Sequence, residues 1–271
     1  MLAFSSLLGN VEGQNIYRIW YDKPASYWEE ALPVGNGRIA AMVFGNPQLE
    51  QIQLNEETVS AGSPYQNYNE EAKTALPEMR RLIFEGKYEE AQNMAATKIL
   101  SQVGNEMPYQ TVGRLNIRYP DHKKVNNYYR DLDISNAVAV TRYEVDGVEF
   151  TEETFASFTD QLVIRHIKAS KPGTINCELF FNTPMRDPKR SIYGKKGLRL
   201  EGITHGSRYF SGKVHYCADL DVKHKGGKVI TANDTLLSVQ GASELTLYIS
   251  MATNFVNYKD ISGRSEERRV G

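Results

Sequence analysis

The fold of this chain is constrained most by a series of short segments, between residues 115 and 251, in which apolar and polar residues alternate. Alternation with a period of two places the apolar side chains on one face of a β-strand. The dipeptides Asp146-Gly147 and Gly226-Gly227 separate such segments, as the two-residue turns of β-hairpins do. The pattern predicts a mainly β chain folded as a large antiparallel sandwich, in which each strand buries one face. The alternating apolar positions are Leu115, Ile117 and Tyr119, then Ala137, Ala139, Tyr143 and Val145, then Ile175, Cys177, Leu179 and Phe181, then Val214, Tyr216, Ala218, Leu220 and Val222, and last Leu245, Leu247, Ile249 and Met251.

Residues 70–101 follow a different, helical period. Pro77 suits the first turn of a helix, and Gly86 interrupts the run of apolar residues. We therefore predict a helical hairpin or a kinked helix, ended by Gly104 and Pro108 and inserted near residues 70–101. The apolar residues at helical spacing are Leu76, Met79, Leu82 and Ile83 before Gly86, and Tyr88, Ala91, Met94, Ala95 and Ile99 after it.

Charge and hydropathy exclude two classes of protein. The 32 Lys and Arg residues nearly balance the 33 Asp and Glu residues, unlike the basic surface with which proteins bind nucleic acid. No stretch reaches the ~20 consecutive apolar residues of a membrane-spanning helix. A chain of 271 residues can bury a sizeable core, so it does not need Cys177 and Cys217 as a disulfide framework. We predict neither a nucleic-acid partner nor a membrane span.

The two ends differ from the rest of the chain. Residues 1–14 begin with the small, apolar run MLAFSSLL, which we interpret as the remnant of a secretory signal or as a disordered start. A signal remnant would place the protein outside the cytoplasm, secreted or periplasmic in a bacterial-type cell. Residues 15–262 read as one domain without a linker, and residues 263–271 turn abruptly charged. We interpret that last segment as a truncated tail.

Motifs for common catalytic chemistries are missing from the sequence. His215 and Cys217 would share one face of a strand, with Cys177 nearby, but no H-x-x-H or C-x-x-C spacing accompanies them, and we interpret them as ordinary sheet residues. No G-x-S-x-G sequence offers a serine nucleophile. Gly35-Asn36-Gly37-Arg38 lacks the third glycine of a phosphate-binding loop. We predict no metal site and no cofactor.

Acidic residues occur in four close pairs, which matters because glycosidases use two carboxylates. Neighbouring residues of a strand point to opposite faces, so an adjacent pair cannot converge on one atom. Asp131 and Asp133 share a face, but no pocket signature flanks them. We interpret all four pairs as solvated surface charge, and we assign no catalytic residue. The pairs are Glu29 with Glu30, Glu56 with Glu57, Asp131 with Asp133, and Glu152 with Glu153.

Two loops are dense in aromatic and polar residues. Residues 20–38 contain both tryptophans of the chain, and residues 55–65 follow an apparent strand with a Gly- and Pro-containing loop. Aromatic rings beside Asn, Glu and Arg suit sugars, whose apolar face stacks while their hydroxyl groups form hydrogen bonds. The same residues also suit a structural role, in which Trp fills a core and Gly-Asn-Gly makes a turn.

These loops, taken with later segments, resemble the start of glycoside hydrolase family 95, the α-L-fucosidases. The resemblance runs in order from about residue 16 to residue 262. It rests on residues 20–25, 28–38, 41–45, 52–56, 62–65, 80–88, 109–110 with Gly113, 129–133, 155–157 and 252–255. It implies a β-supersandwich domain followed by a helical linker, an (α/α)6 barrel and a C-terminal β-domain. It also implies inverting catalysis by a Glu acid and an Asn-assisted Asp base, all within the barrel.

By this resemblance the chain is the non-catalytic N-terminal domain, and alone it is expected to be inactive. The partners implied are fucosylated or related glycans, reached through the full-length enzyme, and the barrel itself. The family often reads Asn-Glu-x-Thr-Leu-Trp-Ser-Gly where this chain has residues 55–62 without the Trp, which weakens the case for a sugar contact from this loop. Substrate-binding or barrel-facing candidates are Trp28, Asn36, Arg38, Asn55, Glu56, Tyr109 and Gln110.

Three alternatives stay open at this point. The substrate could be an α-L-galactoside instead of an α-L-fucoside. The chain could be a self-sufficient carbohydrate-binding module, which predicts a compact platform of exposed Trp and Tyr. It could also be a scaffold sandwich that makes no contact with sugar.

Overall fold

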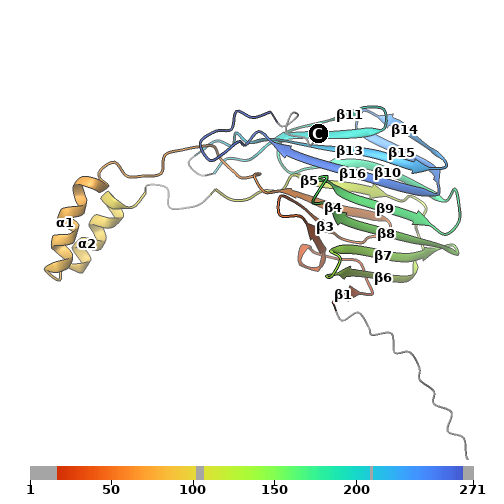
Figure 1. Cartoon of the computed structure of the whole chain (residues 1–271), viewed down its shortest axis with the longest axis horizontal. Coiled ribbons are helices and arrows are strands. Elements are labelled where there is room, and N and C mark those ends of the chain that lie inside the picture. Colours follow the sequence, from red (N-terminus) through yellow and green to blue (C-terminus); the bar gives the residue numbers. More distant parts are fainter. Residues whose placement is uncertain (1–16, 102–106, 208–209, 265–271) are drawn as a thin grey trace, which may run out of the picture.

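The computed structural model describes residues 17–101, 107–207 and 210–264, and within them two antiparallel sheets pack face to face (Figure 1). The first sheet has nine strands in the spatial order β1 (Arg18–Tyr21), β6 (Asn126–Asp133), β7 (Val138–Val145), β8 (Val148–Ala156), β9 (Val163–Ala169), β16 (Glu244–Thr253), β13 (His215–Lys225), β12 (Gly197–Ile203) and β11 (Arg186–Tyr193). The second has seven, in the order β14 (Lys228–Asn233), β15 (Leu236–Ala242), β10 (Ile175–Asn182), β5 (Gly113–Arg118), β4 (Leu49–Glu56), β3 (Ile39–Val43) and β2 (Leu32–Gly35).

The alternation in the sequence produces the core between the sheets. On β16, Leu245, Leu247, Ile249 and Met251 are buried, while the residues between them are only partly buried. Burial of one such side chain stabilises a fold by about 1.5–3 kcal/mol. The mainly β sandwich with a helical insertion is therefore confirmed.

Two predicted turns are confirmed by the backbone. Asp146 and Gly147 join β7 to β8 with φ of 50° and 71°, and Gly226 and Gly227 join β13 to β14 with φ of 70° and 61°. Positive φ at both central residues is the conformation that matches the twist of a tight hairpin.

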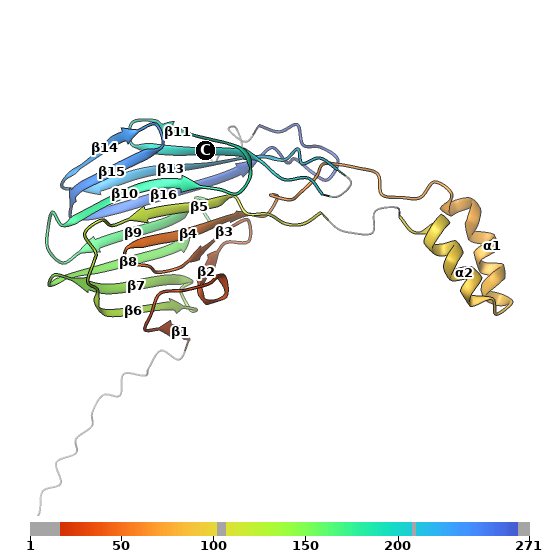
Figure 2. The same ribbon diagram turned by 180° about the vertical axis from the view of Figure 1, so that it is seen from behind.

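The helical insertion comprises α1 (Ala72–Phe84), α2 (Tyr88–Met94) and the π-helical turn η2 (Ala95–Ile99), and it extends away from the sandwich (Figures 1 and 2). Gly86, with φ of 76°, separates α1 from α2 as predicted. Only Ala75, Leu82 and Ala91 are buried in the two α-helices.

Two details of this prediction need correction. Pro77 lies inside α1 and not in its first turn, because a turn at Asn69, whose Oδ1 accepts the Glu71 N–H at 3.0 Å, starts the helix earlier. The helical segment ends at Ile99, before Pro108. Gly104, residues 1–14 and most of residues 263–271 lie outside the described residues.

The interpretation of the acidic pairs as surface charge is wrong for four residues. Glu56, Asp131, Asp133 and Glu152 are all at least nine-tenths buried. Each is enclosed with hydrogen-bond or ion-pair partners: Asp131, for example, lies between Arg18 and Arg142, at 2.9 and 3.5 Å. The sequence pattern missed this because Asp131 and Glu152 find their partners on other strands, whereas Glu56 and Asp133 also accept hydrogen bonds from the turns that follow them.

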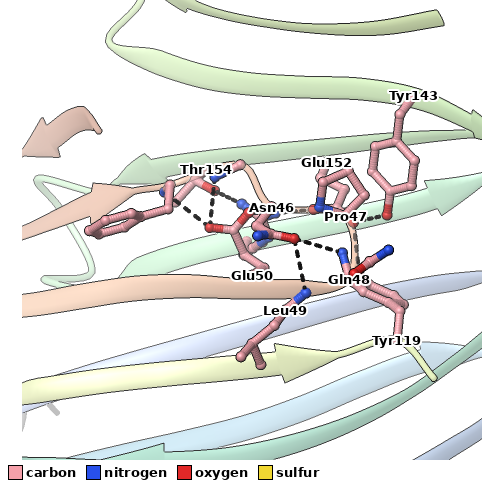
Figure 3. A network of polar contacts seen from close by, with 12 residues as sticks. Asn46, Pro47, Gln48, Leu49, Glu50, Tyr119, Tyr143, Glu152 and Thr154 are labelled. Carbon is pink, nitrogen blue, oxygen red and sulfur yellow. Dashed lines mark hydrogen bonds and ion pairs between the residues drawn. The ribbon is translucent and has the colours of Figure 1, made fainter. Parts of the chain in front are cut away.

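Glu152 belongs to a charged network inside the sandwich (Figure 3). Its carboxylate pairs with Arg165 and accepts hydrogen bonds from the hydroxyl groups of Tyr119 and Tyr143, both at 2.8 Å. Glu50 approaches the same guanidinium at 3.3 Å, and its Oε1 accepts two backbone N–H groups. One arginine therefore serves two buried carboxylates, and burial raises the pKa of Glu50 to about 7.

Candidate functional site

The helical insertion extends from one end of the sandwich (Figure 1). Most of the predicted site residues gather at this end. The β2–β3 turn meets the end of β4 there, because Ile39 pairs with Glu56. The end of β16, the β8–β9 loop and the segment before β5 reach the same place through hydrogen bonds. We call these residues the end cluster: Asn36, Arg38, Asn55, Glu56, Thr58, Tyr109, Gln110, Gln161 and Thr253.

Asn36 shapes the β2–β3 turn and ties it to the other sheet. Its Oδ1 accepts the backbone N–H groups of Arg38 and Ile39 at 3.1 and 2.9 Å. Its Nδ2 donates to the carbonyl of Ser157 at 2.8 Å. Gly37 supplies a φ of 94° at the tip of the turn, where a side chain would strain the backbone. Asn36 is therefore fixed in place and only partly buried.

Arg38 is the central cation of the end cluster. Its Nε donates to Gln161 Oε1 at 2.7 Å, and its Nη1 donates to the Met251 carbonyl at 3.0 Å. The same Nη1 lies 3.4 Å from Glu56 Oε1. About a quarter of the side chain, 27%, stays exposed, so the guanidinium lies at the rim and not in the core.

Glu56 is almost fully engaged. Its Oε2 accepts the backbone N–H of Thr58 at 2.7 Å and the Thr58 hydroxyl at 2.6 Å. The Thr58 hydroxyl also contacts that of Thr253, which links β4 to β16 across the two sheets. With both oxygens occupied, this carboxylate organises the loop and is poorly placed for proton transfer.

Tyr109 and Gln110 fasten neighbouring loops to the end cluster. The Tyr109 hydroxyl donates to the Glu56 carbonyl at 3.0 Å, and burial raises the pKa of Tyr109 above its ordinary value. Asn55 provides a further side-chain hydrogen bond to Tyr109. Gln110 Oε1 accepts the backbone N–H of His205 at 2.9 Å.

Trp28 is the one candidate that the structure leaves apart from the others. It lies in a 3₁₀ turn, η1 (Trp28–Glu30), before β2, whereas Asn36 follows β2. The four residues of β2 span about 13 Å, so the two side chains lie at opposite ends of that strand. The turn is held by Arg130, whose Nη1 donates to the Glu30 carbonyl at 2.8 Å, and Trp28 is 51% exposed.

A cavity of about 670 Å³ opens beside the end cluster. Its walls come from the loop after β4 and the loop after β16, and most of its larger side chains are apolar. These are Tyr65, Met107, Val214, Phe255, Tyr258 and Ile261. Glu57 is the single carboxylate in the lining among the described residues.

A lone carboxylate limits the chemistry available in this cavity. Hydrolysis of a glycosidic bond by either common route requires two carboxyl groups across the bond. Glu50 and Glu152 do point into the sandwich, but they face Arg165 in the packed core and not a cavity. Among the described residues, the lining of the end cavity therefore holds one of the two carboxyl groups that this chemistry requires.

Sequence reasoning missed three members of the end cluster, Thr58, Gln161 and Thr253. Thr253 lies in segment 252–255, which carries the family resemblance, and Thr58 matches the Thr of the family pattern quoted for residues 55–62, so both could have been marked. Gln161 gave no sequence signal, because its role depends on the β8–β9 loop folding back toward Arg38.

Comparison with known proteins places this fold in a family. Residues 19–258 match the family model described as "Glycosyl hydrolase family 65, N-terminal domain". The chain belongs to this family. The family 65 N-terminal domain is named by its position in larger enzymes, which agrees with the predicted resemblance to the first domain of a glycoside hydrolase.

Curated relatives of this chain carry α-fucosidase names. "Alpha-L-fucosidase 2" of Arabidopsis thaliana is 31% identical over 90% of this chain, and "Probable alpha-fucosidase A" of Aspergillus niger is 26% identical over 88%. The chain spans only 31% and 30% of their respective lengths. One solved structure that resembles this chain is provisionally described as a kojibiose phosphorylase from the human microbiome. Its TM-score is 0.48 at 9% sequence identity, and the match covers 95% of this chain and 34% of that one.

None of the helices in the described parts of this family 65 N-terminal domain has the length and apolar character needed to cross a membrane.

Proposed function

We propose that this family 65 N-terminal domain is the non-catalytic first domain of an inverting glycoside hydrolase that acts on α-L-fucosides. In this proposal the acid and the base lie in a following (α/α)6 barrel. The observation that carries the proposal is the end cavity, because Glu57 is the single carboxylate among its described lining residues. The relatives with fucosidase names are about three times as long as this chain, which leaves room for a catalytic barrel. In this proposal the end cavity supports an active site whose two carboxyl groups are supplied by the barrel.

The end cluster is proposed to face that barrel. Asn36, Arg38, Asn55, Glu56, Tyr109 and Gln110 hold their loops rigidly through their hydrogen bonds, as a surface that edges a catalytic pocket must be held. Arg38 and Tyr109 combine fixed geometry with exposed surface, at 27% of the side chain and 53% of the residue, and are the two that would reach beyond the domain. Trp28 would form a separate contact.

Hydrolysis of an aryl α-L-fucoside tests this division of labour. The chain alone should release no aryl alcohol above background, whereas a protein that joins it to the helical barrel should do so. E57Q is the matched control, because it removes the carboxylate of the cavity lining. Turnover by the purified chain would overturn the proposal, and its loss in E57Q would assign that turnover to the end cavity.

Two finer points follow from the same assay. Comparison of aryl α-L-fucoside with aryl α-L-galactoside decides between the two candidate substrates. The galactoside has a hydroxymethyl group where the fucoside has a methyl group. Proton NMR of the first-formed sugar should show inversion at the anomeric carbon, and retention would contradict the proposed barrel chemistry.

We propose further that the protein is exported, as its apolar first residues suggest. Cell fractionation with N-terminal sequencing of the mature protein should find it outside the cytoplasm with those residues removed. An intact start in the cytoplasm would contradict this.

A further inference from the structure

We infer that the outer face of the nine-stranded sheet carries a saccharide-binding groove, distinct from the end cavity. The groove is a hollow of about 570 Å³. It is lined by Tyr193, Asp219, Asp221, Lys223, Tyr248 and Ser250, and Arg38 and Gln161 border it at the end cluster.

The strand register explains why these side chains lie together. Tyr193 pairs with Gly197, Gly197 pairs with Asp221, and Asp221 pairs with Tyr248, so these four form one row across β11, β12, β13 and β16. The row crosses three strand spacings, about 14 Å. The alternate residues of β13 and β16 are buried in the core, so the row itself faces outward.

A neighbouring row runs parallel to the first. It consists of Ser191, Arg199, Asp219 and Ser250, which pair in that order across the same strands. Arg199 and Asp219 are fixed by a two-point ion pair with distances of 2.9 and 3.2 Å. This pair forms a rigid polar floor beside the tyrosines.

Gly197 allows close approach of the backbone between Tyr193 and Asp221. A Cβ atom there would lie 2.3 Å from the Leu220 carbonyl oxygen and 2.7 Å from that of Tyr193, so the backbone leaves no room for a side chain. The two tyrosine rings are each held by a cation: Arg199 lies 4.7 Å from the Tyr193 ring centroid, and Lys223 Nζ lies 4.9 Å from that of Tyr248.

This combination fits a short neutral oligosaccharide. Aromatic rings at both ends of the row offer faces for the apolar side of a sugar ring. Asp221 in the row, with Ser250 and Lys223 in the rows on either side of it, offers acceptors and donors for hydroxyl groups. The mixed charges disfavour an anionic ligand, and the polar floor disfavours an apolar one.

The choice of a fucosylated sugar as the probe rests on the proposed function, but the binding test does not. The 271-residue chain is titrated with 2′-fucosyllactose and with lactose, and binding is followed by calorimetry and NMR. We expect saturable binding of the fucosylated sugar that D221A and Y248A each weaken about tenfold. The matched control Y258A, at an exposed tyrosine of the end cavity, should leave it unchanged.

The outcomes distinguish binding in the groove from binding elsewhere on the domain. Thermal unfolding of each variant shows whether the fold is intact, and D221A, at an exposed position, is the safer of the two. Loss of binding in Y258A with retention in D221A would move the sugar to the end cavity and overturn the inference. Absence of saturable binding to both sugars would also overturn it, even if the barrel-bearing protein hydrolyses fucosides. Binding by the groove without any hydrolysis would instead sustain it and contradict the proposed function.

Discussion

Two arginine–carboxylate arrangements in this domain use the same chemistry in different surroundings. Arg165 lies in the core between Glu50 and Glu152, and all three side chains are at most 2% exposed. Arg38 lies at the end of the sandwich against Glu56, with 27% of its side chain exposed. The first arrangement is closed to any ligand, whereas Arg38 of the second borders the outer groove.

The difference shows how burial decides the role of a charge. Inside the core, removal of one partner leaves another charge without water or counterion, so the arrangement acts on stability. At the rim, solvent screens the ion pair and it contributes little to stability, so its fixed geometry is available for recognition. The same kind of change made in both places therefore tests whether burial sets the two roles.

The largest expected effect comes from replacing each arginine by methionine. R165M should destabilise the domain by about 3–5 kcal/mol, because it leaves Glu50 and Glu152 facing one another in the core. R38M should cost about 1 kcal/mol, the loss of screened contacts to Gln161 and Met251. Urea denaturation of both variants measures the two free energies of unfolding.

Equal effects of R165M and R38M on the free energy of unfolding would contradict this comparison. If the two variants lost equal stability, burial would not distinguish the two arrangements. Should R165M fail to fold, the double variant E50Q/R165M, which removes one of the two stranded charges, is expected to recover part of the stability.

Much of the sandwich was predictable, because the alternation of apolar and polar residues lies within the sequence of each strand. The alternation on β13 and β16 identifies which side chains enter the core, and Asp146-Gly147 identifies a hairpin without reference to any other residue. The helical insertion was equally visible from its period. The prediction that Pro77 lies in the first helical turn was wrong, because the start of the helix depends on a turn at Asn69 that residue spacing alone does not reveal.

The polar sites were predictable only in part. The resemblance marked Asn36, Arg38 and Glu56, and the structure brings these three together. It gave no reason to expect Gln161 beside them, or Glu152 beside Arg165, because both contacts depend on which strands become neighbours. The outer groove depends on a register across four strands that no single segment encodes.

The next largest effect is a pH dependence that belongs to the core alone. The pKa of Glu50 is raised from 4.5 to about 7, so this carboxyl stabilises the fold below pH 4.5, and its contribution is lost as pH rises through 7. Between pH 5 and 8 the loss should be about 2 kcal/mol. Urea denaturation across this range should show stability falling with pH in the parent chain and a flatter profile in E50Q.

A nearby histidine acts in the opposite direction and must be separated from Glu50. Burial lowers the pKa of His122, so its contribution to stability is present at high pH and is lost as pH falls. The difference between the parent chain and E50Q cancels this effect. Parallel pH profiles for the two proteins would show that Glu50 is not the titrating group.

The smallest effect sharpens the comparison with one change made twice, the removal of a tyrosine hydroxyl. Y143F takes a donor from the buried Glu152 carboxylate, at 2.8 Å, and should cost about 1.5 kcal/mol in the core. Y109F takes a donor from the Glu56 carbonyl at the half-exposed end and should cost less than about 0.5 kcal/mol. Thermal and urea unfolding measure both losses of stability, and a larger loss in Y109F would make the end cluster a structural element instead of a surface built for contact.

The same two variants also differ in their expected effect on activity. In the protein that carries the barrel, Y109F should alter fucoside hydrolysis, because Tyr109 faces outward. Y143F should leave hydrolysis unchanged at temperatures where the domain is folded, because Tyr143 is buried.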